Sequence, residues 1–398
     1  MNKWQRIKFQ PNIPLSENGE KVTACAAHRQ LSKDAAKEGM VLLKNNGLLP
    51  FSKGSRLALF GKACFDYVKG GGGSGDVTVD YVVNLHDGLK ALGEYVSLYE
   101  ELSDFYRKDV DRQYAEGAEP GMTAEPVLSE ELVKKARAVT DTAVISICRF
   151  SGEGWDRKSS FDEGKQDEEK EEGLLKKSRK LFERGDFYLS DGETAMVESV
   201  KKHFDKIVVV LNVGGMVDTS WFVREDKIKS VLMAWQGGME GGRAAAELLC
   251  GIGNPSGKLS DTFAGALEDY PSTAAFHDSE SCVDYTEDIY VGYRYFETML
   301  GAAEKVNYPF GYGLSYTSFQ IDQGEAFGED GSYTLPVTVT NTGKKEGKEV
   351  VQIYGQAPQG KLGKPARVLI AFEKTRELKP GESQVLSIDF SIDTLASY

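Results

Sequence analysis

Two carboxylates lie in the polar stretch RFSGEGWDRKSS, residues 149–160, which directly follows the apolar segment TAVISIC. Glu153 stands between two glycines, so we expect its carboxylate to be accessible on a specially shaped turn. An accessible carboxyl group at the end of a buried strand could transfer a proton as a general acid or base. Asp156 and Arg157 are neighbours and are suited to an ion pair that keeps the loop rigid. On residue types alone, Glu153 could also be a surface carboxylate in a salt bridge, and both interpretations stay open.

A second stretch, KGGGGSGD at residues 69–76, is suited to binding through the backbone. Its glycines leave room for backbone amides and the Ser74 hydroxyl to approach a polyhydroxylated ligand. A phosphate-binding loop would start directly after a strand and carry a GK[ST] pattern, and this stretch does neither. The remaining alternative is a plain tight turn.

The elements that must position these two stretches alternate between apolar strands and helices. Helices are predicted at residues 31–43, 82–93, 132–139, 190–203 and 239–251, and strands at residues 56–61, 142–148, 207–212 and 230–235. Ser190 and Glu193 form a capping-box pattern at the start of the fourth helix.

The strands are continuous apolar runs rather than alternating ones, which indicates a parallel sheet covered on both faces. We therefore predict a doubly wound, mostly parallel α/β sandwich over residues 30–265. Ligands in such sheets bind outside the carboxyl ends of the strands, where both polar stretches would lie.

The rest of the chain differs in its pattern of apolar and charged residues. The last part is rich in alternating apolar runs, which predicts an antiparallel β-sandwich that is incomplete because no closing strand follows. Two charged insertions are most typical of solvated helices or surface loops. The predicted parts are an N-terminal extension at 1–29, insertions near 105–130 and 159–185, an irregular aromatic segment at 266–325 and the β-sandwich at 326–398.

Composition excludes several classes of function. The net charge of -13 argues against nucleic acid binding, which needs a clustered basic surface. No segment approaches the about 18 consecutive apolar residues of a membrane helix, and MNKWQRIKFQ lacks a signal-peptide core, so a cytoplasmic location is predicted. The five cysteines show no CxxC pair, which favours buried thiols over a zinc site or a disulfide framework.

An ordered series of motifs resembles glycoside hydrolase family 3. The series comprises RFSGEGWDR, GDFYLSD, VVVLNVG, LMAWQGGMEGGRAAAELLCGIGNPSGKLSDTF, YTEDIYVGYRYFET and YPFGYGLSYTSF. The family contains β-glucosidases and β-xylosidases that join a (β/α)8 barrel, an α/β sandwich and a fibronectin type III-like domain. The resemblance runs from KEGMVLLKNNGLLP to the end of the chain.

The resemblance implies roles for the polar stretches. Retaining glycosidases use two carboxyl groups about 5 Å apart, one as nucleophile and one as general acid and then base. Glu153 matches the family's acid/base, whereas the nucleophile is an Asp on the barrel. Ser74, with Gly73 beside it, and Trp155 would bind substrate. Asp156 and Arg157 would hold the loop in shape, and neither a cofactor nor a metal is needed.

The chain departs from the family pattern in one large respect. The family's barrel, with its Ser-Asp-Trp-like nucleophile motif and the Lys-His pair that contacts the sugar hydroxyls, has no counterpart in the sequence. The resemblance is then to members with reversed domain order, in which the barrel would follow Tyr398. A split subunit or a gene fragment are the alternatives. The insertion at 159–185 could shape the aglycone side of the site or be a surface excursion.

Two functions remain. In the first, the chain supplies the acid/base of a retaining β-glycosidase that hydrolyses terminal non-reducing β-D-glucosyl or xylosyl residues, and is inactive without its barrel, present in cis or in trans. The substrate would be a β-linked oligosaccharide or an aryl or alkyl glycoside. In the second, the chain is a non-catalytic carbohydrate-binding or scaffolding module. Neither function involves nucleic acid or membrane.

Overall fold

The computed structural model describes residues 24–152, 180–276, 281–361 and 363–397, together with Gly19 and Ser178. The chain divides into two compact units, which are described separately. The first unit comprises Met1–Val217 with Arg224–Gly253, and the second comprises Asp218–Val223 with Asn254–Tyr398.

The first unit is built on a six-stranded sheet with the strand order β1-β6-β5-β4-β2-β3. Strands β2 to β6 pair in parallel and β1 pairs antiparallel with β6, which confirms the predicted, mostly parallel sheet. The two central strands, β4 and β5, are almost wholly buried because β-branched and apolar residues fill both of their faces. The strands are β1 Val41–Asn45, β2 Ser55–Phe60, β3 Val96–Leu98, β4 Thr142–Cys148, β5 Lys206–Asn212 and β6 Ile228–Met233.

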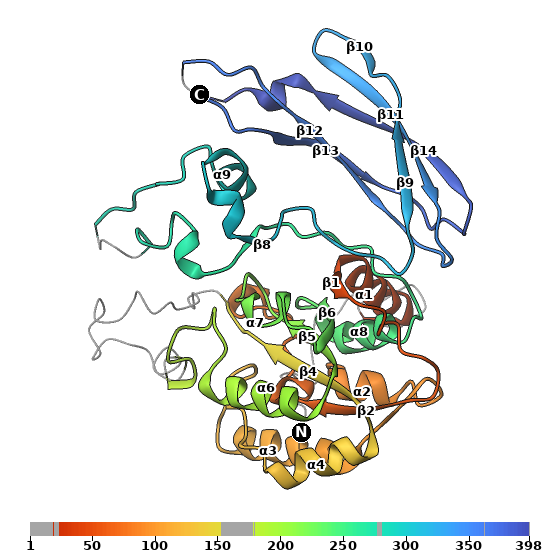
Figure 1. The fold of residues 1–398 in the computed structure, drawn as a ribbon, viewed down its shortest axis with the longest axis vertical. Coiled ribbons are helices and arrows are strands. Elements are labelled where there is room, and N and C mark those ends of the chain that lie inside the picture. Colours follow the sequence, from red (N-terminus) through yellow and green to blue (C-terminus); the bar gives the residue numbers. More distant parts are fainter. Residues whose placement is uncertain are drawn as a thin grey trace. The chain divides into compact units, whose positions relative to one another are not determined.

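Helices cover both sides of this sheet. Helices α1 and α2 pack against α8, and α4 packs against α6. Figure 1 shows the strands between α1 and α8 on one side and α3, α4 and α6 on the other. The helices are α1 Ala26–Gly39, α2 Leu85–Lys90, α3 Glu100–Ala115, α4 Glu130–Val139, α6 Asp191–His203 and α8 Gly241–Leu249, with short 3-10 helices at Lys62–Cys64, Gly73–Gly75 and Gly238–Glu240.

Polar residues cap the N-termini of several helices. The Ser190 hydroxyl accepts a hydrogen bond from the backbone N–H of Glu193, and the Glu193 carboxylate accepts one from the backbone N–H of Ser190. This capping box confirms the prediction for α6. Ser129 caps α4 and Asn84 caps α2, each by accepting one hydrogen bond from a backbone N–H of the first turn.

The helix predicted at residues 31–43 was wrong in its last four residues. Helix α1 ends at Gly39, and Val41–Asn45 forms a strand whose Val41 pairs with Met233 of β6. Residues 40–43 are all fully buried, so the ladder with β6 provides partners for backbone groups that lie away from water. Tertiary pairing therefore overrides the helical spacing of the apolar residues.

The strand order creates a switch point between β2 and β4. From β2 the chain passes outward to β3, whereas β4, β5 and β6 follow on the other side of β2. Loops that leave the carboxyl ends of β2 and β4 therefore lie at the place where sheets of this kind commonly bind ligands. The stretches at 69–76 and 149–152 follow these two strands.

The second unit combines an irregular segment with antiparallel sheets. Strands β9, β10, β11 and β14 form one sheet and β12 and β13 another, around a core that includes Val337, Val339, Val351 and Leu386. The antiparallel fold predicted for the end of the chain is confirmed. The elements are α7 Ser220–Val223, β7 Phe263–Ala264, α9 Tyr293–Thr298, β8 Val306–Tyr308, β9 Phe319–Gln323, β10 Phe327–Glu329, β11 Ser332–Asn341, β12 Val350–Gly355, β13 Val368–Lys374 and β14 Ser383–Ser391, with 3-10 helices at Leu267–Asp269, Ala302–Lys305 and Ile392–Leu395.

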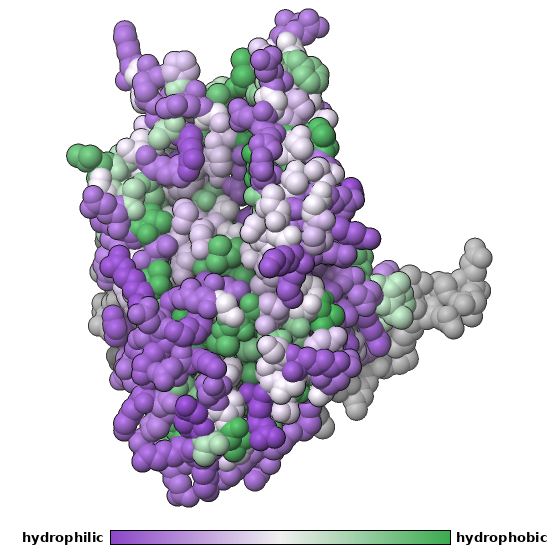
Figure 2. All heavy atoms as spheres, turned by 45° about the vertical axis from the view of Figure 1, so that its right-hand side comes forward, coloured by the Kyte–Doolittle hydropathy of each residue, from purple (hydrophilic) through white to green (hydrophobic). Residues whose placement is uncertain are grey.

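The exposure of hydrophilic residues and of cysteines agrees only in part with what the composition predicts. The face shown in Figure 2 is mainly hydrophilic, with smaller apolar areas between the charged side chains. Within the described residues, none of the helices is both long and apolar enough to cross a membrane. Cys64, Cys148 and Cys250 are buried free thiols as predicted, but Cys25 is partly exposed and Cys282 is exposed.

The contact between α2 and α8 depends on glycine. A Cβ atom at Gly242 would lie 2.3 Å from the backbone carbonyl of Asn84 and 2.4 Å from the carbonyl oxygen of Val83. We predict that Gly242→Ala lowers the free energy of unfolding by about 1–3 kcal/mol, because the two helices must move apart. The matched control is Gly39→Ala at the end of α1, where a Cβ meets nothing within 4 Å. Urea denaturation checks both variants, and equal midpoints would contradict the prediction.

Candidate active site

The two predicted stretches meet at the carboxyl edge of the sheet. Gly72 and Gly152 form a parallel β-bridge, and the backbone N–H of Gly72 donates a hydrogen bond to the carbonyl oxygen of Ser151 at 3.3 Å. The glycine-rich loop therefore lies directly beside the first residues of RFSGEGWDR.

Only glycine allows this approach. A Cβ atom at Gly152 would lie 2.4 Å from the backbone nitrogen of Gly72 and 2.5 Å from its Cα atom. A Cβ atom at Gly72 would lie 3.1 Å from the ring of Phe150. Gly152, the glycine before the acidic residue in the sequence, is thus required for contact between the two backbones.

Ser74 lies at an exposed turn of the glycine-rich loop. Gly73 has a φ of 64°, in the left-handed region, and opens the 3-10 turn Gly73–Gly75. The loop is closed by an ion pair between Lys69 Nζ and Asp76 Oδ1 at 2.8 Å, and the Lys69 side chain is only 4% exposed. Ser74 and Gly73 are therefore presented on a short turn of fixed geometry.

Four of the predicted site residues lie outside the described residues. These are Glu153, Trp155, Asp156 and Arg157. The described chain reaches Gly152, one residue before Glu153, and this is where the two loops touch.

A buried amide that the sequence analysis did not single out joins the loops. The Asn212 side chain, at the end of β5, accepts a hydrogen bond from the backbone N–H of Val68 at 2.6 Å and donates to the carbonyl oxygen of Val68 at 2.9 Å. It also donates to the carbonyl oxygen of Trp235 at 2.7 Å. Its own backbone carbonyl accepts a hydrogen bond from the backbone N–H of Arg149. The only signal in the sequence was an amide residue ending the apolar run IVVVLN.

Arg149 is a structural cation beneath the loop. Its guanidinium donates to both carboxylate oxygens of Glu193, at 2.8 and 2.7 Å, and the two side chains are only 2% and 3% exposed. It also donates to the carbonyl oxygens of Asp186 and Tyr188 in GDFYLSD. Burial alone would raise the pKa of Glu193, but the Arg149 charge and its hydrogen bonds hold that pKa below the usual value.

A second buried ion pair supports the exit of β2. Lys62 Nζ lies 2.9 Å from Asp66 Oδ2, and Asp66 also accepts hydrogen bonds from the Tyr114 hydroxyl and from the hydroxyl and backbone N–H of Thr123. Despite burial, the Lys62 charge and these donors hold the pKa of Asp66 below its usual value. Part of the insertion near 105–130, predicted to be solvated, is therefore buried beneath the site, because it provides partners for this carboxylate.

Glu125, from the same insertion, behaves differently. Its Oε2 accepts a hydrogen bond from the backbone N–H of Lys62 at 2.9 Å, and its buried Oε1 has no hydrogen-bond partner among the described residues. Burial raises the pKa of Glu125 to about 8, an effect that the backbone N–H of Lys62 opposes and the nearby Glu193 charge reinforces. The carboxyl group is therefore protonated at neutral pH. Among the described residues, His, Cys, Asp and Glu form no group of three that could hold a metal ion.

Breaking the Arg149–Glu193 pair should be costly. We predict that Glu193→Gln lowers the free energy of unfolding by about 3–5 kcal/mol at pH ~7, because it leaves the Arg149 charge buried and unpaired. Because the folded-state pKa of Glu193 is lowered from 4.5, the stabilisation is present above that pH and is lost as the pH falls. Urea denaturation at about pH 7 and about pH 3 measures both effects. Glu198→Gln, an exposed change in the same helix, is the control, and an equal loss there would refute this role.

Glu125 should give the opposite pH dependence. Its pKa is raised from 4.5 to about 8 in the folded chain, so the folded state holds a proton that the unfolded state releases as the pH rises through this range. We predict that the stability of Glu125→Gln rises relative to that of the unsubstituted chain between about pH 5 and 8. The difference in free energy of unfolding should grow by at most about 1.4 kcal/mol per pH unit. Urea denaturation across this range tests it, with the exposed Glu131→Gln as control. Parallel pH curves would contradict the assignment.

Comparisons with known proteins agree with this architecture. Residues 40–316 match the Glycosyl hydrolase family 3 C-terminal domain, and residues 349–398 match the Fibronectin type III-like domain. The chain is 56% identical to Beta-glucosidase A of Butyrivibrio fibrisolvens, over 100% of this chain and 50% of that protein. It is 41% identical to a Beta-glucosidase of Ruminococcus albus, over 91% of this chain and 36% of that protein.

Solved structures show the same fold. A β-glucosidase from Paenibacillus barengoltzii superimposes with a TM-score of 0.82 at 40% identity, covering 94% of this chain and 39% of that one. Beta-glucosidase 3B from Thermotoga neapolitana, solved in complex with glucose, gives a TM-score of 0.79 at 36% identity, covering 94% of this chain and 50% of that one. The chain thus spans half or less of the length of these relatives. With a family match over residues 40–316, it belongs to glycosyl hydrolase family 3.

Proposed function

We propose that this chain is part of a retaining β-glucosidase and supplies the general acid/base, Glu153, while the nucleophile lies outside the chain. The observation that carries the proposal is the backbone contact of Gly72 with Gly152 at the switch point of the sheet, one residue before Glu153. The names of the relatives support the class of reaction, because the three cited here are β-glucosidases.

The reaction would proceed in two displacements. In the first, the protonated Glu153 donates its proton to the glycosidic oxygen as the nucleophilic carboxylate attacks the anomeric carbon and the bond to the aglycone breaks. In the second, the Glu153 carboxylate takes a proton from water, whose oxygen attacks the anomeric carbon and releases the carboxylate nucleophile. The same side chain therefore acts as acid and then as base.

The described residues would position the groups that contact the sugar and hold the base of the acid/base loop. Gly73 and Ser74 would contact sugar hydroxyls, since they lie on an exposed turn that the Lys69–Asp76 pair closes. Trp155 would provide an apolar ring, and Asp156 with Arg157 would stabilise the loop. Arg149 and Asn212 would hold the base of that loop, because both are buried and fully engaged with the strand ends.

Several finer points stay predictions. The partner would be a (β/α)8 barrel in cis or in trans, and the chain alone would be inactive. The substrate would carry a terminal β-D-glucosyl or xylosyl group. The predicted cytoplasmic location and the domain bounds at residues 30, 266 and 326 also stay predictions.

The experiment measures p-nitrophenol release from p-nitrophenyl β-D-glucoside by the 398-residue chain and by the product of the complete native reading frame. We expect turnover only from the longer protein, and a loss in kcat of about 10²–10⁴ in Glu153→Ala. Azide should restore much of the rate, because it is an anionic nucleophile that can attack the glycosyl intermediate in place of water without help from a base, and the activated aryl group needs little acid assistance. Glu198→Ala, an exposed carboxylate in α6, is the matched control.

Three outcomes would count against the proposal. Equal activity of the short and long proteins would show that the carboxylates are not divided between this chain and another domain. A slow Glu153→Ala variant that azide does not rescue would make Glu153 a structural residue. Sugar binding without turnover by either protein would favour the non-catalytic alternative.

A further inference from the structure

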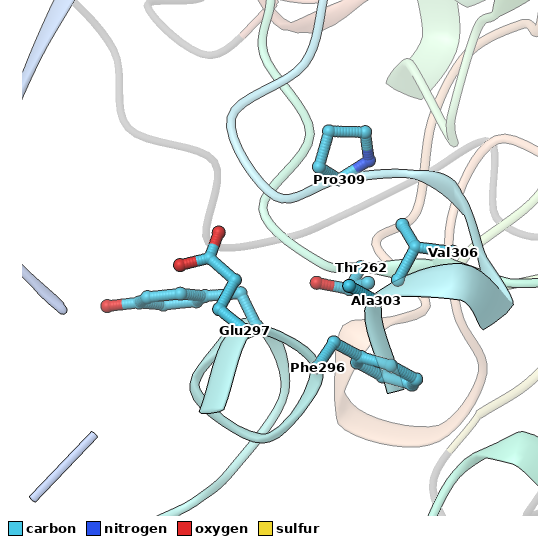
Figure 3. Close-up of a pocket in the computed structure, with 7 residues that line it drawn as sticks. Thr262, Phe296, Glu297, Ala303, Val306 and Pro309 are labelled. Carbon is cyan, nitrogen blue, oxygen red and sulfur yellow. The ribbon is translucent and has the colours of Figure 1, made fainter. Parts of the chain in front are cut away.

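The second unit contains a cavity that the proposed glycosidase site does not use. Its volume is about 330 Å³, within the range of small-molecule sites. Figure 3 shows the side chains that surround it, which come from the segment between β7 and β8 and its flanks. The lining residues are Thr262, Tyr293, Phe296, Glu297, Ala303, Val306 and Pro309.

The walls are mainly apolar and are fixed by packing. Phe296 is 1% exposed and packs in a small core with Ala264 and Ala302. The ring of Tyr293 stacks on Phe310 at 4.5 Å, and its hydroxyl oxygen accepts a hydrogen bond from the backbone N–H of Leu369 at 2.7 Å. The cavity therefore has pre-formed aromatic sides, which reduces the entropy cost of binding.

One buried polar atom in this wall has no partner. Thr262 is 2% exposed, and its Oγ1 makes no hydrogen bond with any described residue, although its backbone carbonyl accepts one from the Tyr270 hydroxyl. Figure 3 shows the hydroxyl oxygen of Thr262 turned toward the space between Phe296, Glu297 and Pro309. A buried hydroxyl without a partner is unfavourable, so a bound group that can donate to it or accept from it would be stabilised there.

Another polar group of the lining, the Glu297 carboxylate, is already held in place. Both of its carboxylate oxygens accept hydrogen bonds from the Arg367 guanidinium, at 2.6 Å each. Arg367 in turn lies over the ring of Tyr354, 4.6 Å from its centroid. This pairing neutralises the carboxylate charge but leaves lone pairs that can accept one further hydrogen bond.

We propose that this cavity binds a small aromatic alcohol, whose ring lies between the apolar walls and whose hydroxyl pairs with Thr262 Oγ1. A monosaccharide fits less well, because its several hydroxyls would be buried against apolar walls that offer few partners. An anion fits less well, because the Arg367 guanidinium beside the lining is already paired with Glu297. The proposal concerns the second unit and does not depend on the glycosidase activity.

The test uses 4-fluorophenol, with 4-fluorotoluene as the matched ligand that lacks the hydroxyl, and fluorine NMR titrations of the 398-residue chain. We expect 4-fluorophenol to bind with a Kd on the order of 1 mM. Thr262→Val should weaken it about tenfold while leaving 4-fluorotoluene binding unchanged. The same variant should not lower Tm in the absence of ligand, because it removes an unpaired buried hydroxyl.

A second variant tests the position of the site. Ala303 is exposed at the edge of the cavity, so Ala303→Phe should fill the cavity without displacing the core and abolish binding of both ligands. Thr340→Val in β11 of the sandwich is the control and should bind as the unsubstituted chain does. Absence of 4-fluorophenol binding at ~10 mM, or unchanged affinity in either cavity variant, would overturn the proposal.

Discussion

The side-chain amide of Asn212 is the interaction on which the carboxyl edge of the sheet depends. It joins Val68, beyond β2, to Trp235, beyond β6, while its own backbone carbonyl bonds to Arg149 after β4. Three chain segments that are far apart in the sequence therefore meet at one buried residue. An amide can do this because it carries two donors and an acceptor and has no charge to desolvate. A carboxylate at this position could not donate to the two carbonyl oxygens, and an apolar residue would leave the backbone groups of Val68 and the carbonyl oxygen of Trp235 without the partner that the amide provides.

The ion pairs beneath this edge explain how polar loops can be both exposed and rigid. Arg149 and Lys62 are each buried against a carboxylate and additional hydrogen-bond partners, so neither charge is left unpaired. Because a buried pair holds both partners to one geometry, the chain on either side of it has little freedom. Arg149 fixes the start of the loop and, through Asp186 and Tyr188, the segment that enters α6. A small apolar cluster supports the same loops, because Val79, Val82 and Phe150 pack against the buried residues Ala63, Val68 and Cys148.

The sequence predicted what local patterns determine and missed what distant contacts determine. The runs TAVISIC and IVVVLN and the Ser190–Glu193 capping box are local, and the strands and the helix start are where they were expected. The strand Val41–Asn45 was missed because its partner, β6, is distant in the sequence. Glu193 was recognised as a capping residue but not as the partner of Arg149, since only the fold brings the two together. The charged insertion near 105–130 was taken as solvated because its pattern does not reveal that Asp66 needs Tyr114 and Thr123 as donors.

The ionisable groups beneath the loops stabilise the fold most in mildly acidic solution, and the proposed chemistry is favoured under the same condition. Glu193 stabilises the fold only while it is ionised, which sets an acidic limit near its ordinary pKa of 4.5. Glu125, with a pKa of about 8, stabilises the fold most while it is protonated, so its contribution to stability falls as the pH rises above 4.5. The two together place the greatest stability of the loop framework in mildly acidic solution. A glycosidase acid/base must also be protonated when it meets the leaving oxygen, and low pH favours that state. The pH that best preserves the supporting framework would therefore also favour the protonated form of Glu153 in the first displacement.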